Sequence, residues 1–145
     1  MKKIQLIFLQ IAIICFSLSS CNLDQIESSF PDYNSAHSAG LFNHSWIPQE
    51  LIFKSMTDIH QKTDLDLNTC IFAYKLAGTD IDSLSKRIFK TRGQNRIITN
   101  ISLPKWFNTK VHSSNWALYD KRESDTVFII IDKSQSKVFG WRNNK

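Results

Sequence analysis

The densest group of side chains capable of chemistry lies in residues 58–68. Asp58 and His60 are followed at alternate positions by Asp64, Asp66 and Asn68. Carboxylate and amide oxygens spaced in this way open calcium-binding loops, where they surround one hard cation. A metal ion held there would activate water for hydrolysis. The pattern therefore leaves open a metal-assisted hydrolase that uses the Asp58–Asn68 region.

Two later positions depart from a calcium loop. Thr69 stands where the turn Gly belongs, and Lys75 replaces the closing Glu, so its charge would repel the ion. The four histidines, at positions 37, 44, 60 and 112, include no pair with the helical spacing of a zinc site. We therefore predict no metal site and expect the side chains of Asp64 to Asn68 to form local caps and turns.

Motifs for nucleophilic or phosphate chemistry are absent from the sequence. It contains no Gly-x-Ser-x-Gly elbow, and its four glycines, at 40, 78, 93 and 140, form no phosphate-binding loop. Asp80 and Asp82 fall at an expected helix start, where carboxylates favour the helix dipole. We therefore expect no catalytic residue, no cofactor and no enzymatic activity.

The amino terminus has the parts of a secretory signal peptide. Lys2 and Lys3 precede an apolar run from Ile4 to Leu18, and Ser19 and Ser20 follow it. The run spans about 15 residues, whereas a membrane-spanning helix needs about 20. This pattern predicts an exported protein whose leader, residues 1–20, is removed.

Leu18-Ser19-Ser20-Cys21 resembles the bacterial lipobox. The resemblance implies that the Cys21 thiol receives a diacylglycerol, that cleavage occurs before Cys21, and that the new amine is acylated, for example with palmitate. Two or more acyl chains anchor a protein stably. The expected partner of Cys21 is therefore a lipid bilayer, and the expected location is the periplasmic or cell-surface side of a membrane. The alternative is an ordinary secreted protein in which Cys21 is incidental.

The remaining cysteines and the charge agree with an exported domain. Cys15 is lost with the leader, so Cys70 has no partner for an internal disulfide and is expected to be a small buried hydrophobe. Loss of Lys2 and Lys3 lowers the net charge from +5 to +3. We expect the basic residues between positions 86 and 96 to form a solvated helix face, or to be attracted to anionic lipid headgroups, and not to bind nucleic acid. Asn22, after the modified cysteine, favours the outer membrane if the host has two membranes.

The elements predicted before position 104 are short. We expect a tether over residues 21–29, a helix from Ser29 or Phe30 to Gly40 and a helical turn from Ser55 to about Gln61. An apolar run predicts a strand from Cys70 to Leu76. Further predictions are a helix over 79–92 and an extended segment over 97–103 that ends at Pro104.

The carboxyl third predicts a meander of three antiparallel strands. Runs rich in aromatic and branched residues cover 114–119, 126–132 and 137–141, with polar turns at 121–124 and 133–136. We therefore predict one α+β domain over residues 30–145, in which short helices pack on one face of a small antiparallel sheet.

A set of residues in the first half of the domain has a recognisable order and spacing: Phe30-Pro31-Asp32-Tyr33, Ala36, Gly40, Trp46-Ile47-Pro48, Ser55, Asp58-Ile59 and Asp64-Leu65-Asp66-x-Asn68. Near its end the chain also has Ile131-Asp132 and Val138-Phe139-Gly140-Trp141. With these residues, part of the mature chain resembles the YbbD-like bacterial proteins, except that Gly140 replaces an expected aromatic residue. The resemblance implies no particular activity.

These patterns together favour a membrane-anchored lipoprotein whose domain binds a protein or glycan partner in the cell envelope without catalysing a reaction. The metal-assisted hydrolase of residues 58–68 is one alternative. A purely structural envelope lipoprotein is the other.

Overall fold

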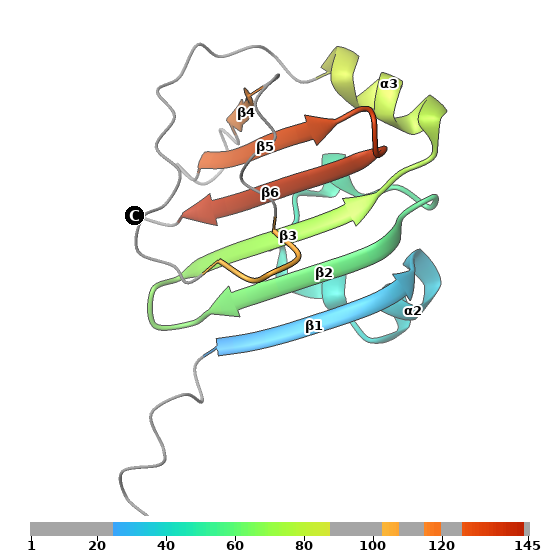
Figure 1. The fold of residues 1–145 in the computed structure, drawn as a ribbon. Helices are drawn as coiled ribbons and strands as arrows, with labels where there is room; N and C mark the ends of the chain where they lie inside the picture. Colours follow the sequence, from blue (N-terminus) through green and yellow to red (C-terminus); the bar gives the residue numbers. More distant parts are fainter. Residues whose placement is uncertain (1–24, 88–102, 108–114, 120–125, 144–145) are drawn as a thin grey trace, which may run out of the picture.

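The fold is built on one six-stranded antiparallel sheet (Figure 1). The computed structural model describes residues 25–87, 103–107, 115–119 and 126–143. The strands lie side by side in the order β1-β2-β3-β6-β5-β4. Their bounds are β1 Gln25–Asp32, β2 Thr57–Asp64, β3 Thr69–Lys75, β4 Asn115–Tyr119, β5 Thr126–Asp132 and β6 Lys137–Asn143.

Two local units meet at the centre of this sheet. The hairpin of β2 and β3 carries β1 on its outer edge, and β4, β5 and β6 form the predicted meander. The units join where β3 pairs with β6 over its whole length, from Thr69 opposite Asn143 to Lys75 opposite Lys137. β3 is a nearly continuous apolar run and β6 is apolar from Val138 to Trp141, as expected for strands that are covered on both faces.

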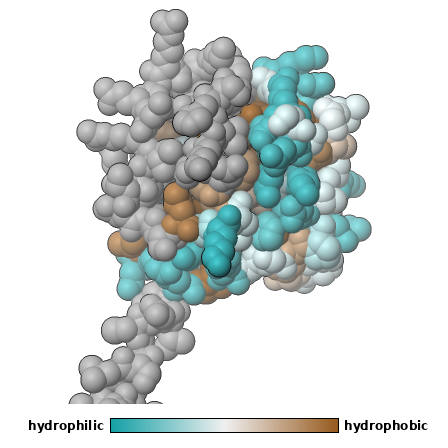
Figure 2. Space-filling model, viewed as in Figure 1, coloured by the Kyte–Doolittle hydropathy of each residue, from teal (hydrophilic) through white to brown (hydrophobic). Residues whose placement is uncertain are grey.

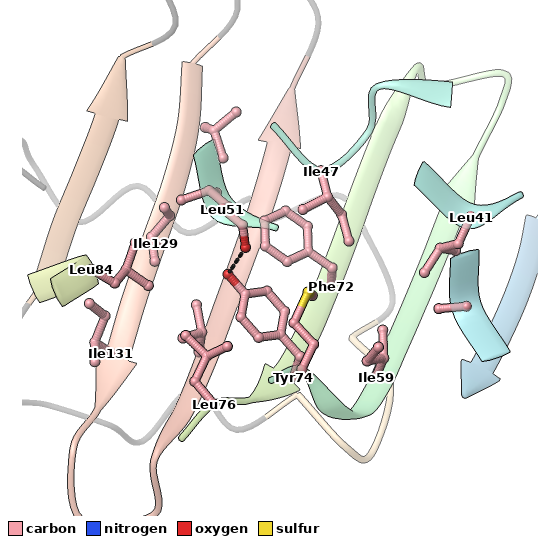
Figure 3. Packing of buried hydrophobic residues seen from close by; sticks show 14 of the residues in the cluster. Leu41, Ile47, Leu51, Ile59, Phe72, Tyr74, Leu76, Leu84, Ile129 and Ile131 are labelled. Carbon is pink, nitrogen blue, oxygen red and sulfur yellow. Dashed lines mark hydrogen bonds between the residues drawn. The ribbon is translucent and has the colours of Figure 1, made fainter. Parts of the chain in front are cut away.

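Short helices cover one face of the sheet, which we call the helical face. They are α2 (Tyr33–Ser38), α3 (Gly78–Arg87) and the 3₁₀ helices η1 (Leu41–His44) and η2 (Gln49–Leu51). Phe72 and Tyr74 of β3 point into this layer and are fully buried, and the Tyr74 hydroxyl donates to the Leu51 carbonyl at 2.9 Å (Figure 3). The predicted α+β class, with helices on one face of the sheet, is confirmed.

The opposite face carries a second, smaller apolar cluster. Alternate residues Ile71 and Ala73 of β3 point to this side together with Phe139 and Trp141 of β6. The segment 103–107 crosses it and buries Phe107 against those two aromatic rings. We call this side the open face, because no helix of the described residues covers it.

Two predictions in the first half of the chain are wrong. The expected helical turn from Ser55 to Gln61 is extended from Thr57 onward, as the start of strand β2, and the Ser55 hydroxyl bonds to Asp80 of α3. The expected helix from Ser29 to Gly40 begins only at Tyr33, because Asp32 caps it by accepting the Ser35 N–H at 2.8 Å. In both places, pairing between β1 and β2 prevails over local helix signals.

The start of the sheet also differs from the expected end of the tether. Residues 25–29, which we assigned to the tether, pair with β2 and form the first half of β1. The strand predicted over 70–76 and the start of the helix predicted at 79 are confirmed. The helix end beyond 87, the extended segment 97–102 and the turn 121–124 lie outside the described residues. Within the described residues, no helix has the length and apolar character needed to cross a membrane.

Candidate functional site

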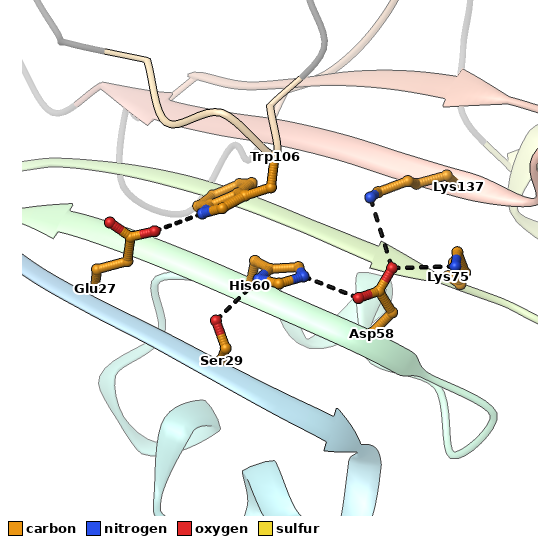
Figure 4. A network of polar contacts seen from close by, with 7 residues as sticks. All are labelled: Glu27, Ser29, Asp58, His60, Lys75, Trp106 and Lys137. Carbon is orange, nitrogen blue, oxygen red and sulfur yellow. Dashed lines mark hydrogen bonds and ion pairs between the residues drawn. The ribbon is translucent and has the colours of Figure 1, made fainter.

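A connected group of polar side chains lies on the open face, near the edge of the sheet that β1 forms (Figure 4). We call this group the His60 network. It draws on strands β1, β2, β3 and β6 and on the segment 103–107. Its members are Glu27, Ser29, Asp58, His60, Lys75, Trp106 and Lys137.

His60 is held on three sides. Its Nδ1 lies 2.9 Å from the Ser29 hydroxyl and its Nε2 lies 2.9 Å from Asp58 Oδ1. The imidazole stacks on Trp106, with 5.2 Å between ring centroids and 20° between planes. Because an ionised carboxylate only accepts, Nε2 carries a proton toward Asp58; in a neutral imidazole, Nδ1 then accepts from the Ser29 hydroxyl.

Asp58 is the anionic centre of the network. Its Oδ2 lies 3.2 Å from Lys75 Nζ and 3.7 Å from Lys137 Nζ. Partial burial acts to raise the pKa of Asp58, but hydrogen bonds from His60 and Lys75 and the charge of Lys137 together hold this pKa below its usual range. The Asp58 backbone has a φ of 50°, and it lies at an irregularity in the β2–β3 pairing, between Thr57 and His60.

Trp106 links the network to the segment 103–107. Its Nε1 donates to Glu27 Oε1 at 2.6 Å, across 79 positions of sequence. Its neighbour Phe107 is buried against Phe139 and Trp141. The network therefore fastens the segment to the edge strand, while Phe107 fastens it to the centre of the sheet.

The order Ser29, His60, Asp58 has the hydrogen-bond polarity of a nucleophile, a base and an orienting carboxylate. Serine nucleophiles in hydrolases need backbone N–H groups aimed at the developing oxyanion, usually on a sharp turn. Ser29 lies within the extended strand β1, where N–H groups lie in the plane of the sheet and side chains stand perpendicular to it. Among the residues that the structure describes, Ser29 therefore positions His60, and the N–H groups of its own strand are not turned toward its hydroxyl.

The residues of the alternative metal-assisted site do not converge. Asp58 and Asp64 lie near opposite ends of β2, about 20 Å apart at the rise of a strand. Among the residues the structure describes, no three His, Cys, Asp or Glu side chains are grouped to hold a metal ion. The hydrolase alternative for residues 58–68 therefore has no metal centre in the described part of the chain.

Asp64 and its neighbours instead shape the hairpin between β2 and β3. Asp64 Oδ1 accepts from the Leu67 N–H at 3.0 Å, and Oδ2 accepts from the Gln25 amide at 2.9 Å. Asn68 takes a left-handed conformation, with a φ of 48°. The prediction that this stretch makes local caps and turns is confirmed.

The other singled-out residues have packing roles where the structure describes them. Cys70 is fully buried, and burial raises the pKa of its thiol well above the ordinary value, as expected for a small hydrophobe. His37 packs on Tyr33, with 5.6 Å between the rings. Arg87 of the basic stretch donates to the Glu50 carbonyl at 3.3 Å and lies over the Phe53 ring. Cys21 and His112 lie outside the described residues.

Sequence reasoning missed the His60 network because it assigned residues 55–61 to a helical turn. Asp58 and His60 are two positions apart, so on a strand they share a face, and this spacing was the available signal. Ser29 reaches His60 only through the β1–β2 register, in which the two residues are directly paired. No local pattern indicates the contacts of Glu27 with Trp106 or of Lys137 with Asp58.

We expect the Asp58→Asn variant to be less stable than the parent protein at pH 7. The folded pKa of Asp58 is below the unfolded value, so its ionised form stabilises the fold near neutrality, and this contribution disappears as the pH falls below about 4. Because 39% of the side chain is exposed, solvent screening limits the contribution to roughly 1 kcal/mol or less. Urea unfolding of both proteins from pH 7 to pH 3 measures the difference.

The matched control for this titration is Asp82→Asn, which removes an exposed carboxylate 3.2 Å from Lys133. It should change the free energy of unfolding by less than Asp58→Asn at pH 7. A difference between Asp58→Asn and the parent protein that stays constant down to pH 3 would contradict the assigned role of the Asp58 charge.

Comparison with known proteins gives one match, to a family of domains. Residues 24–75 match the model of the YbbD head domain. No curated protein and no solved structure matches the chain. The matched part spans β1, α2, η1, η2, β2 and β3, and so contains Ser29, Asp58, His60 and Lys75, whereas Trp106 and Lys137 lie beyond it. The first half of the folded domain is thus similar to the YbbD head domain, as the sequence resemblance over residues 30–68 predicted.

Proposed function

We propose that the chain is a lipoprotein of the bacterial cell envelope, anchored to a membrane through acylated Cys21, whose domain binds an envelope partner without catalysing a reaction. The observation that carries the anchor is the position of Cys21. Only residues 22–24 separate it from the first residue of β1. A lipid on this thiol would hold the sheet close to the bilayer without any further tether.

The other cysteine supports the choice of Cys21. Cys70 is fully buried between β2 and β6. A thiol in that position is closed to an acylating enzyme once the domain has folded. After loss of the leader with Cys15, Cys21 is the thiol that remains for a lipid. Asn22 favours the outer membrane in a host with two membranes.

Substitution of Cys21 tests the anchor. We expect the full chain to enter the detergent phase when Triton X-114 separates, and Cys21→Ala to stay in the aqueous phase. Cys70→Ala is the matched control and should partition like the parent protein. Trypsin should release a peptide, Cys21–Lys54, that carries the mass of a diacylglycerol and one more acyl chain. A mature chain that begins elsewhere, or an unmodified Cys21 thiol, would overturn the anchor.

A binding role without catalysis is supported by the contacts within the His60 network, whose polar atoms bond to one another. Both nitrogens of His60 and both oxygens of Asp58 are engaged within the network. The imidazole face lies against Trp106. These contacts hold the side chains of the network in place, so the network stabilises the open face as a surface that a partner can bind.

A reactive serine would overturn this part of the proposal. A fluorophosphonate probe labels serines that are activated by a base and an oxyanion site, and we expect it to leave Ser29 unmodified. Labelling of Ser29 that disappears in His60→Ala would identify a hydrolase. Affinity capture from solubilised membranes should recover a reproducible protein or glycan partner. Loss of envelope integrity on deletion, with no saturable ligand, would instead indicate a structural lipoprotein.

A further inference from the structure

Exposed aliphatic side chains gather at one end of the sheet. Four large hydrophobic residues are prominently exposed among those the structure describes, and three of them are Ile26, Leu65 and Leu67, with exposed fractions of 51%, 53% and 49%. Ile26 is the second residue of β1, and Leu65 and Leu67 lie in the β2–β3 hairpin. We call these three residues the aliphatic rim.

Pairing between β1 and β2 brings the three residues together. Ile26 is opposite Thr63, and Gln25 is opposite Asp64, after which the hairpin begins. The Asp64 carboxylate ties the two elements by accepting from both Gln25 and Leu67. Figure 1 shows the start of β1 and the β2–β3 hairpin at the same end of the sheet, away from α3 and the β5–β6 turn. Figure 2 shows hydrophobic atoms among polar ones at that end.

The rim lies where the chain comes from Cys21. Four residue steps separate Cys21 from Gln25, and an extended chain covers at most about 14 Å in that number of steps. Acyl chains on Cys21 would therefore keep this end of the sheet within reach of the headgroup and acyl boundary. Exposed aliphatic residues that cluster in space mark contact surfaces more often than isolated ones do.

We propose that the aliphatic rim inserts into the surface of the bilayer that holds the acylated Cys21, so that the sheet stands with its β2–β3 hairpin end toward the lipid. This proposal rests on the proposed anchor. The occupant is the apolar boundary of the membrane and not an anionic headgroup, because Asp66 is exposed between Leu65 and Leu67 and no cation is exposed within residues 63–70. The orientation places α3 and the β5–β6 turn away from the membrane, where a partner can reach them.

The cysteines of the chain allow a clean probe of this orientation. Cys70 is buried and Cys21 would carry lipid, so a cysteine introduced at the surface is the accessible thiol for a nitrobenzoxadiazole label. Full-length protein with Leu67→Cys is purified from membranes, labelled and reconstituted into phosphatidylcholine vesicles with or without doxyl groups on the acyl chains. The matched control is Gln135→Cys, an exposed position in the β5–β6 turn at the other end of the sheet.

We expect the doxyl chains to quench the label at position 67 by about twofold or more, and the label at position 135 to be unaffected, because inserted groups reach about 5–10 Å into the boundary. A label at Ile26→Cys should behave like the one at 67, and should lose most of its quenching when Leu65→Ser and Leu67→Ser are added. If the protein floats with the vesicles but the doxyl chains quench the labels at positions 67 and 135 equally, the insertion alone is overturned. Protein that does not float with the vesicles would overturn the anchor itself.

Discussion

Gly140→Ala is expected to lower the free energy of unfolding by about 1–3 kcal/mol, the usual cost of forcing a methyl group into a packed core. Gly140 of β6 is paired with Phe72 of β3, and the Phe72 ring lies over its Cα. A methyl group at 140 would overlap three atoms of this ring. Phe72 is fully buried and stacks on Tyr74, with 6.1 Å between ring centroids, so the ring has little room to move.

The sign of the change in the free energy of unfolding shows whether position 140 has room for a methyl group. In a strand with free space, Gly→Ala usually stabilises a protein, because Ala has fewer unfolded conformations. Gly78→Ala is the control, since a methyl group at 78 meets nothing within 4 Å. In urea, Gly140→Ala should unfold at a lower midpoint than the parent protein. The midpoint of Gly78→Ala should not be lower than that of the parent protein. Adding Phe72→Leu to Gly140→Ala should recover part of the lost free energy of unfolding. If the losses from the two substitutions simply add, the close contact between Phe72 and Gly140 is contradicted.

The contact also explains why the last strand departs from the aromatic residue expected at position 140. The aromatic ring over this part of the sheet comes from the neighbouring strand, as Phe72, and it needs a bare backbone beneath it. A ring on β6 at the same position would compete for the space that Phe72 fills.

Phe107→Ala is expected to cost about 3–5 kcal/mol, as for other buried aromatic residues that are truncated to Ala. Phe107 is 6% exposed and makes edge-on contacts with Phe139 and Trp141, at 5.5 and 6.3 Å between ring centroids. Its loss would also uncover Ile71, Ala73 and the other apolar residues of the open face. We therefore expect stronger binding of the dye ANS, together with a lower urea midpoint.

Leu103→Ala is the control within the same segment, because Leu103 is among the exposed residues. It should change the free energy of unfolding by less than about 1 kcal/mol. If Phe107→Ala were equally mild, the segment 103–107 would not close the open face, and the His60 network would then be its main attachment.

The strands of the sheet pair through residues that are far apart in sequence. Local sequence patterns therefore predict some of the strands and miss others. β3, β5 and β6 are correctly predicted because each is an apolar run between polar turns, and burial on both faces makes that signal strong. β1 and β2 are missed. Their residues are mostly polar, because β1 is an edge strand and β2 carries the His60 network on one face.

The sequence by itself determined the α+β class and the meander of the last three strands, since each is written in contiguous residues. Only the tertiary structure decided that Ser29 meets His60, that Trp106 meets Glu27 and that Phe72 covers Gly140. The physical reason is register: each contact depends on which residues of two strands, or of a strand and the crossing segment, lie opposite each other. That alignment is selected by the burial of the whole sheet, and no single segment encodes it.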